Sequence, residues 1–341
     1  MPKSNSSKIA IYAALAGNLL VALTKFIAAA LSGSSSMLSE GIHSLVDTGN
    51  EVLLLYGLRR ARRRPTTAHP LGYGRELYFW SFIVAVLLFA LGAGVSTYQG
   101  IARIRAPEPV EHLGLNYIVL GLSFLFEGVS WRVSQRAFAA AKGELGWWEA
   151  VRRSKDPSSF IVLFEDTAAL IGIAIAAGGL YLAETLDLPV FDGIASLLIG
   201  LVLGVTAALL ARESKGLLIG ERADPGTAAA IEALAAAEAG VVSANGLLTV
   251  QLAPDQIVAA LSLEFDDALA TPQIERAVAA IEQRVRTKHP EVTALFVKPQ
   301  SAGAFDRARR AVGGADAVAT HTVGHAAFDS RPGKAGDRAG D

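Results

Sequence analysis

Long apolar stretches alternate with short polar segments along the first 211 residues of the chain. Six of the stretches are long enough to cross a membrane, because the hydrocarbon core of a bilayer takes about 20 residues in a helix. We expect these helices at residues 9–31, 37–58, 78–101, 115–137, 160–183 and 190–211. The pattern therefore predicts a six-helix transmembrane domain over residues 9–211, preceded by a short N-terminal tail at residues 1–8.

The pattern then changes to that of a small water-soluble domain. An alanine-rich stretch that follows Asp224 is typical of a helix with this aspartate as its N-cap. Two apolar stretches joined at Pro254 predict two strands, and an amphipathic helix capped by Thr271 and a last strand at residues 292–299 follow. This order predicts a two-layer α+β domain over residues 212–300.

Composition supports a membrane protein, since 52% of the residues are hydrophobic and only 18% are charged. The chain has no cysteine, which excludes disulfides and thiolate metal sites. A net charge of −1 gives no basis for nucleic-acid binding. Residues 301–341 are rich in Gly, Ala, Asp and Arg without apolar periodicity, so we expect a disordered tail there.

Lysine and arginine near the helix ends predict the orientation in the membrane. Basic residues gather at 59–64, 141–157 and 211–215, whereas the loops at 33–36 and 184–189 carry none. Because cytoplasmic loops carry the excess of positive charge, we expect both termini in the cytoplasm, with a bacterial inner membrane as the location. Two arginines of the remaining outer loop, Arg103 and Arg105, depart from this pattern.

Polar groups concentrate in the second apolar stretch, within the sequence SEGIHSLVDTGN (residues 39–50). His43 and Asp47 are four residues apart, so a helix places them on one face. Such groups inside a membrane are costly unless they face a partner, an aqueous cavity or a cation. The pair is thus either a structural hydrogen bond between helices or part of a cation site.

Two adjacent carboxylates, Glu165 and Asp166, lie inside the fifth stretch. Neighbours on a helix project about 100° apart. We therefore expect one of them to face the second helix and the other to face the fourth helix, where Glu127 lies. Carboxylates with a neutral imidazole suit a divalent cation of the zinc class. Lys25 in the first helix is the internal candidate for a positive charge, and its long stem predicts that it reaches toward the outer interface.

Several motifs together resemble the cation diffusion facilitators, a family of six-helix, proton-coupled exporters of divalent cations with a cytoplasmic ferredoxin-like domain. They are the His-Ser-x-x-Asp core at 43–47, HPLGYGRE at 69–76, GAGVSTYQGI at 92–101 and FDGIASLLIG at 191–200. The resemblance extends over residues 9–300. The stretch KDPSSFIVLFEDTAALIG is similar to a subgroup related to the mitochondrial zinc exporters, which has a Glu-Asp pair at this place.

The resemblance implies a metal site made of His43, Asp47 and Asp166. Glu165 is implied as a fourth ligand or as a proton carrier, and Glu127 is a second candidate proton carrier. If Asp166 completes the site, we expect it to face the second helix and Glu165 to face the fourth helix near Glu127. Val162 stands where members of the family commonly have a histidine. These assignments imply a proton-coupled antiporter that exports a divalent cation, with zinc as the first choice.

The same resemblance implies a secondary transporter that is not an enzyme and has no prosthetic group. Its partners are then the metal ion, protons, membrane lipid and a second copy of the chain, with no nucleic acid. A non-transporting metal-binding scaffold and an exporter of manganese, iron or cobalt remain alternatives.

The expected soluble domain lacks the histidines with which many members of this family bind zinc. His289 fits a role at a helix end. His69 is a candidate for a metal site in the loop after the second helix, whereas His112, His321 and His325 fit solvated positions.

Overall fold

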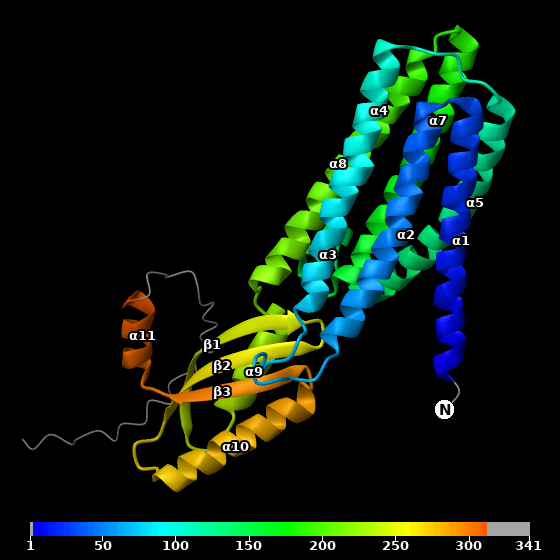
Figure 1. Ribbon diagram of the computed structural model, residues 1–341. Coiled ribbons are helices and arrows are strands. Elements are labelled where there is room, and N and C mark those ends of the chain that lie inside the picture. The colour runs from blue at the N-terminus through cyan, green and yellow to red at the C-terminus, as the bar shows by residue number, and fades with distance from the viewer. Residues whose placement is uncertain (1–2, 312–341) are drawn as a thin grey trace, which may run out of the picture. The chain divides into compact units, whose positions relative to one another are not determined.

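The computed structural model describes residues 3–311 (Figure 1). Its first part is helical: α1 (Lys3–Ser32), α2 (Ser35–Ala61), α3 (Glu76–Leu87), η1 (Leu88–Ala93), α4 (Gly94–Arg105), α5 (Leu113–Lys142), α6 (Trp147–Arg153), α7 (Pro157–Leu186) and α8 (Val190–Ile219). The second part contains α9 (Pro225–Ala236), β1 (Val241–Ala253), β2 (Gln256–Phe265), α10 (Thr271–Lys288), β3 (Val292–Pro299) and α11 (Ala302–Ala311). The chain divides into two compact units, with a boundary after Arg222 and residues 250–257 counted with the first.

Five helical stretches of the described chain are long and apolar enough to cross a membrane. They are the part of α1 from Leu15 onward, the continuous stretch from α3 through η1 to α4, and helices α5, α7 and α8. Helix α2 is the expected span that these five do not include. It packs against α1, α3, α4, α7 and α8, so its polar side chains lie inside the helical bundle.

The helices are longer than the apolar stretches that predicted them. Helix α8 continues to Ile219, where the apolar pattern predicted an end at residue 211. The polar residues that follow the apolar stretch include Arg212, Glu213 and Lys215, which are good helix formers. The short helix α6 was not predicted, because its seven residues are too few to show a period.

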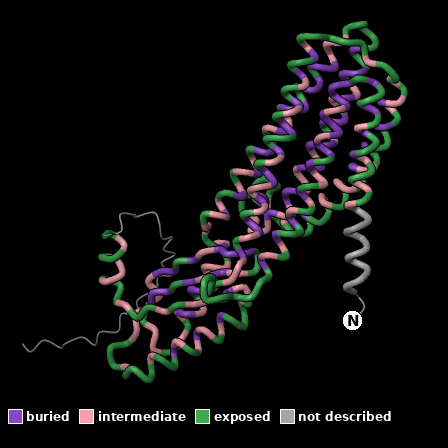
Figure 2. The backbone as a smooth tube through the Cα atoms, in the orientation of Figure 1, coloured by how far each residue is buried: buried purple, intermediate pink, exposed green. Residues whose placement is uncertain are grey.

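Close packing between α4 and α8 depends on glycines. A Cβ atom at Gly100 would lie 2.7 Å from Leu197, and one at Gly200 would lie 2.7 Å from the hydroxyl of Thr97. Small residues let helix backbones approach in a membrane, where packing contributes much of the helix association. Buried positions accordingly follow the inward sides of the helices, while exposed positions face outward (Figure 2).

The second part of the chain contains one three-stranded sheet in the order β1–β2–β3. Helix α9 begins after Asp224, whose carboxylate accepts from the N–H of Gly226, as the sequence predicted. Helix α10 begins at Thr271 itself, so the prediction of Thr271 as the cap was wrong. Its N-cap is Ala270, whose N–H donates to the side chain of Gln273 at 2.7 Å.

Helix α10 packs against both α9 and β3. The predicted disordered tail was wrong for residues 302–311, which form the amphipathic helix α11. The rest of that tail, including His321 and His325, lies outside the described residues.

Candidate cation site

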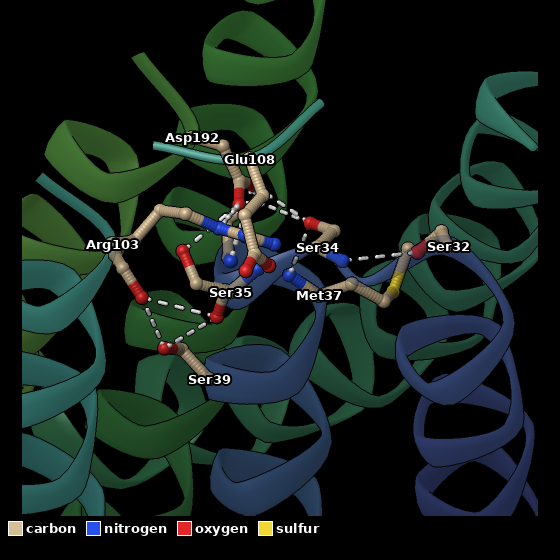
Figure 3. A network of polar contacts seen from close by, with 10 residues as sticks. Ser32, Ser34, Ser35, Met37, Ser39, Arg103, Glu108 and Asp192 are labelled. Carbon is tan, nitrogen blue, oxygen red and sulfur yellow. Dashed lines mark hydrogen bonds and ion pairs between the residues drawn. The ribbon is translucent and has the colours of Figure 1, made fainter. Parts of the chain in front are cut away.

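The first turn of α2 is anchored by a carboxylate from another helix. Asp192 on α8 accepts hydrogen bonds from the hydroxyls of Ser34, Ser35 and Ser36 at 2.7, 2.8 and 2.5 Å (Figure 3). It also accepts from the backbone N–H of Ser35 at 2.6 Å and of Ser36 at 3.2 Å. A carboxylate at a helix N-terminus satisfies free N–H groups and complements the helix dipole. Asp192 therefore fixes the start of the helix that carries most of the polar groups.

Arg103 joins this cluster, which explains its departure from the charge pattern of the loops. Its guanidinium contacts Glu108 at 2.8 Å and lies 3.6 Å from Asp192. The side chain is buried, with 8% of its surface exposed. Arg103 thus neutralises two carboxylates, and its charge is not a free positive charge of the loop.

Lys25 does not extend to the membrane surface, so that prediction was wrong. Its side chain is fully buried, and its Nζ lies 3.0 Å from Glu40 Oε2. The same Nζ donates to the hydroxyl of Ser44 at 2.8 Å. The charge stays inside because α2 supplies a carboxylate and a hydroxyl within reach of the ammonium group.

A small cavity of about 20 Å³ lies beside α2, next to Ser44, Asp47 and Glu51. It is near the middle of α1, α2 and α5, and its volume suits one water-sized occupant. Five of its lining side chains are carboxylates, and three are not. The carboxylates are Asp47, Glu51, Glu127, Glu165 and Asp166, and the others are Asn18, Ser44 and Val162. This concentration of negative charge in a buried space calls for a cation or for protons.

The two adjacent carboxylates of α7 point in the opposite sense to the prediction. Glu165 faces α2, where it accepts from Asn50 Nδ2 at 2.6 Å. Asp166 faces α5, where it accepts from the hydroxyls of Ser130 at 3.1 Å and Ser134 at 3.0 Å. The angle between neighbours was as expected, but the rotation of α7 about its own axis reverses the assignment.

His43 lies beside the cavity and is not among the described residues that line it. Its Nδ1 is 3.3 Å from Asp47 Oδ1, in a geometry that makes no hydrogen bond. The ring is fully buried, and neither nitrogen has a hydrogen-bond partner among the described residues. A buried imidazole without a hydrogen bond is unusual, and its unprotonated nitrogen is a candidate ligand atom.

Two lining residues were missed by the sequence analysis. Glu51 is four residues after Asp47, so it continues the same face of α2, and this spacing was the signal that could have found it. Asn18 on α1 donates to Glu51 at 2.7 Å. A single asparagine in an apolar stretch gave no signal of its own, because its partner belongs to a different helix.

The predicted site residues therefore gather in one region without closing on an ion. No set of three described His, Asp or Glu side chains converges closely enough to hold a metal. His69, the candidate in the loop, packs against Tyr73 with the two rings tilted by 32° and 4.5 Å between ring centres. His289 ends α10 and lies 3.2 Å from Glu291, so a helix end is its observed place.

Comparison with known proteins gives a family match. The family model of the cation efflux transmembrane domain matches residues 11–219. The chain is 33% identical over 264 residues to the mouse protein named "Proton-coupled zinc antiporter SLC30A9, mitochondrial", which covers 76% of this chain and 46% of that protein.

Two further relatives come from a plant and a bacterium. "Metal tolerance protein C4" of Arabidopsis thaliana is 36% identical over 220 residues, or 64% of this chain and 48% of that protein. "Zinc transporter ZitB" of Escherichia coli is 31% identical over 113 residues, or 33% of this chain and 35% of that protein. The chain spans about half the length of the first two relatives.

Proposed function

The chain belongs to the cation efflux family, and on this premise we propose that it is a proton-coupled antiporter that exports a divalent cation, with zinc as the first substrate. Members of this family are secondary transporters, so the chain is not an enzyme. The observation that carries the proposal is the buried cavity with five carboxylates. Two relatives named as zinc transporters support zinc, and one of these is named as proton-coupled.

The proposed ligands are Asp47, Glu165, Asp166 and His43. The three carboxylates already line the cavity, and the ring of His43 beside it makes no hydrogen bond to the described residues. Imidazole and carboxylate are ligands that zinc accepts when no thiolate is present. Glu165 faces α2, the helix that carries Asp47, and both carboxylates line the cavity. We therefore assign Glu165 as a ligand and Glu127 as a proton carrier.

Exchange of a cation for protons follows from the chemistry of these groups. Metal binding requires deprotonated carboxylates and a neutral imidazole, so protons compete with the ion for the same atoms. The site would load the ion from the cytoplasm, reorient, release it as protons bind, and return protonated. The serine hydroxyls that hold Asp166 would keep its carboxylate in place during the exchange.

The arrangement in the membrane belongs to the same proposal. We infer six spans, which are the five apolar stretches and α2. Helix α2 can cross the membrane although it is more polar, because the other helices enclose its polar side chains. The basic loops support cytoplasmic termini. We also infer that the C-terminal domain is ferredoxin-like and joins two copies of the chain. The predicted location in a bacterial inner membrane has no support from the two relatives that match most of the chain, because one is a plant protein and the other is named as mitochondrial.

Metal uptake by everted membrane vesicles tests the proposal. Zinc should accumulate inside the vesicles when their interior is acidic, and collapse of the pH gradient should stop the uptake. Vesicles that hold Asp47→Asn in place of the native protein provide the matched blank. Zinc binding without any uptake would favour a scaffold, and uptake of manganese in preference to zinc would correct the substrate.

A further inference from the structure

Lys25 is a buried charge that lies outside the proposed ligand set. It lies on α1 with none of its side chain exposed, and it bridges two residues of α2. Its ammonium contacts Glu40 at 3.0 Å and the Ser44 hydroxyl at 2.8 Å. Because burying two charges costs free energy that their attraction does not always return, stability alone is a weak reason for the pair.

Ser44 connects this ion pair to the cation cavity. Its side chain lines the cavity on one side and accepts the hydrogen bond from Lys25 on the other. No lysine or arginine is among the described residues that line the cavity. Because Lys25 bonds to Ser44, its ammonium lies one residue behind the cavity wall. Its positive charge has the opposite sign to the carboxylates that line the cavity and attracts them.

Glu40 holds the ammonium from the side away from the cavity. Its carboxylate is fully buried, and its Oε1 has no hydrogen-bond partner among the described residues. Gly172 on α7 packs against this oxygen so closely that a Cβ atom there would collide with it. The pair is therefore confined, with its positive end directed at Ser44 and its negative end at α7.

We propose that Lys25 is a tethered counter-cation that limits how tightly the cavity holds a divalent ion. The inference rests on the proposed transport function and assigns a residue that sets affinity and release. Five carboxylates line the cavity and attract a divalent ion, whereas a transport site must also let its ion leave. A fixed ammonium behind Ser44 repels the bound ion and so lowers its affinity without contacting it.

Neutral double variants separate this role from a structural one. In K25Q/E40Q, the two amides can still bond to each other and to Ser44. In K25M/E40Q, the methionine side chain is unbranched and nearly as long as that of lysine. Both remove the two charges together, so neither leaves an unpaired charge in the membrane. Zinc and cobalt affinity would be measured on the full-length purified protein, and turnover in proteoliposomes at saturating zinc.

We expect both double variants to bind zinc roughly tenfold more tightly, because they remove the repulsion by the ammonium together with the smaller attraction by the Glu40 carboxylate on its far side. Turnover should fall by a similar factor, because release becomes slower. E40Q alone should weaken zinc binding, since it leaves the ammonium without its carboxylate. Wild-type affinity and turnover in both double variants would overturn the inference and make the pair structural.

The proposed function is judged separately in the same experiment. If the wild type carries no zinc under a pH gradient, the transport proposal fails whatever the Lys25 variants do. If the wild type transports zinc and both double variants match it, only the role of Lys25 fails. Should one double variant not reach the membrane, the other decides, because either is sufficient to remove the charge.

Discussion

Glu165 and Asp166 are neighbours in sequence, but they bond to different helices. Asn50 of α2 holds the first, and two serines of α5 hold the second. Each carboxylate therefore has its own support, and a substitution at one position leaves the other in place. Individual roles at the cavity can thus be tested residue by residue.

Asp47→Asn removes a charge from the cavity and changes little of the shape. We expect zinc affinity to fall by at least about 100-fold and transport to fall to background, since the loss of even a supporting residue costs up to that factor. Zinc titration and vesicle uptake measure both effects. Glu111→Gln, an exposed carboxylate in a loop, is the matched control and should behave as wild type. Uptake that survives in Asp47→Asn would remove this residue from the site.

Glu165→Gln and Glu127→Gln separate ligand from proton carrier. We expect a large loss of zinc affinity in Glu165→Gln, because this carboxylate faces α2 and lines the cavity together with Asp47. Glu127→Gln should keep affinity near that of the wild type and make transport less dependent on the pH gradient. Binding and gradient-driven uptake are measured side by side. The reverse pattern would exchange the two assignments.

Val162→His places an imidazole at a position that lines the cavity. It is four residues before Asp166, so both side chains lie on one face of α7. Imidazole favours zinc over manganese, and we expect the variant to transport zinc in stronger preference to manganese. Competition between the two metals for uptake measures the change. An unchanged preference would mean that the new side chain does not reach the ion.

At the scale of the elements, α2 is held at its beginning by α8. The carboxylate of Asp192 receives three hydroxyls and two backbone N–H groups from residues 34–36. This contact between Asp192 and residues 34–36, here called the joint, fixes the position of α2 along its own axis. It thereby also fixes the positions of His43, Asp47 and Glu51. A weaker joint should therefore affect the stability of the bundle before it affects the chemistry of the cavity.

Asp192→Asn tests the joint. The new amide group would direct its own N–H donors at N–H groups, and we expect a loss of about 2–3 kcal/mol, the value of hydrogen bonds to a charged partner. The midpoint of thermal unfolding in detergent should fall by several degrees. Asp187→Asn is the control, because Asp187 is exposed and asparagine tolerates its positive φ of 55°. Equal midpoints for the two variants would show that the joint contributes nothing.

At the scale of the whole molecule, the two compact units divide the work in the proposed function. The acidic cavity belongs to the helical unit, whereas the C-terminal unit presents one described histidine, His289, already beside Glu291. No group of three metal-ligating side chains is present among its described residues. In the proposed function this unit joins two copies of the chain, and we expect that association not to depend on zinc.

We expect full-length Asp47→Asn to retain less than one zinc per two chains after removal of free metal. Its dimerisation should be unchanged by a chelator. Metal analysis and light scattering on the same sample measure the two quantities. A sub-micromolar site that survives in this variant would indicate a zinc site elsewhere, with Asp266 and Asp267 as the carboxylates to test first.

The sequence by itself determined most of the helices and strands and where polar groups interrupt the apolar stretches. Apolar stretches of membrane length predicted the helices, and Asp224 predicted the start of α9, because length, periodicity and capping depend on neighbouring residues. The same stretches also indicated a buried cation site, because His43, Asp47, Glu165 and Asp166 are costly in a membrane without one. Only the tertiary structure decided which of these groups meet, since that depends on how each helix is rotated and what it packs against. This rotation turned Glu165 toward α2 and Asp166 toward α5, brought Asn18 to Glu51, and kept Lys25 inside the bundle beside Glu40 and Ser44.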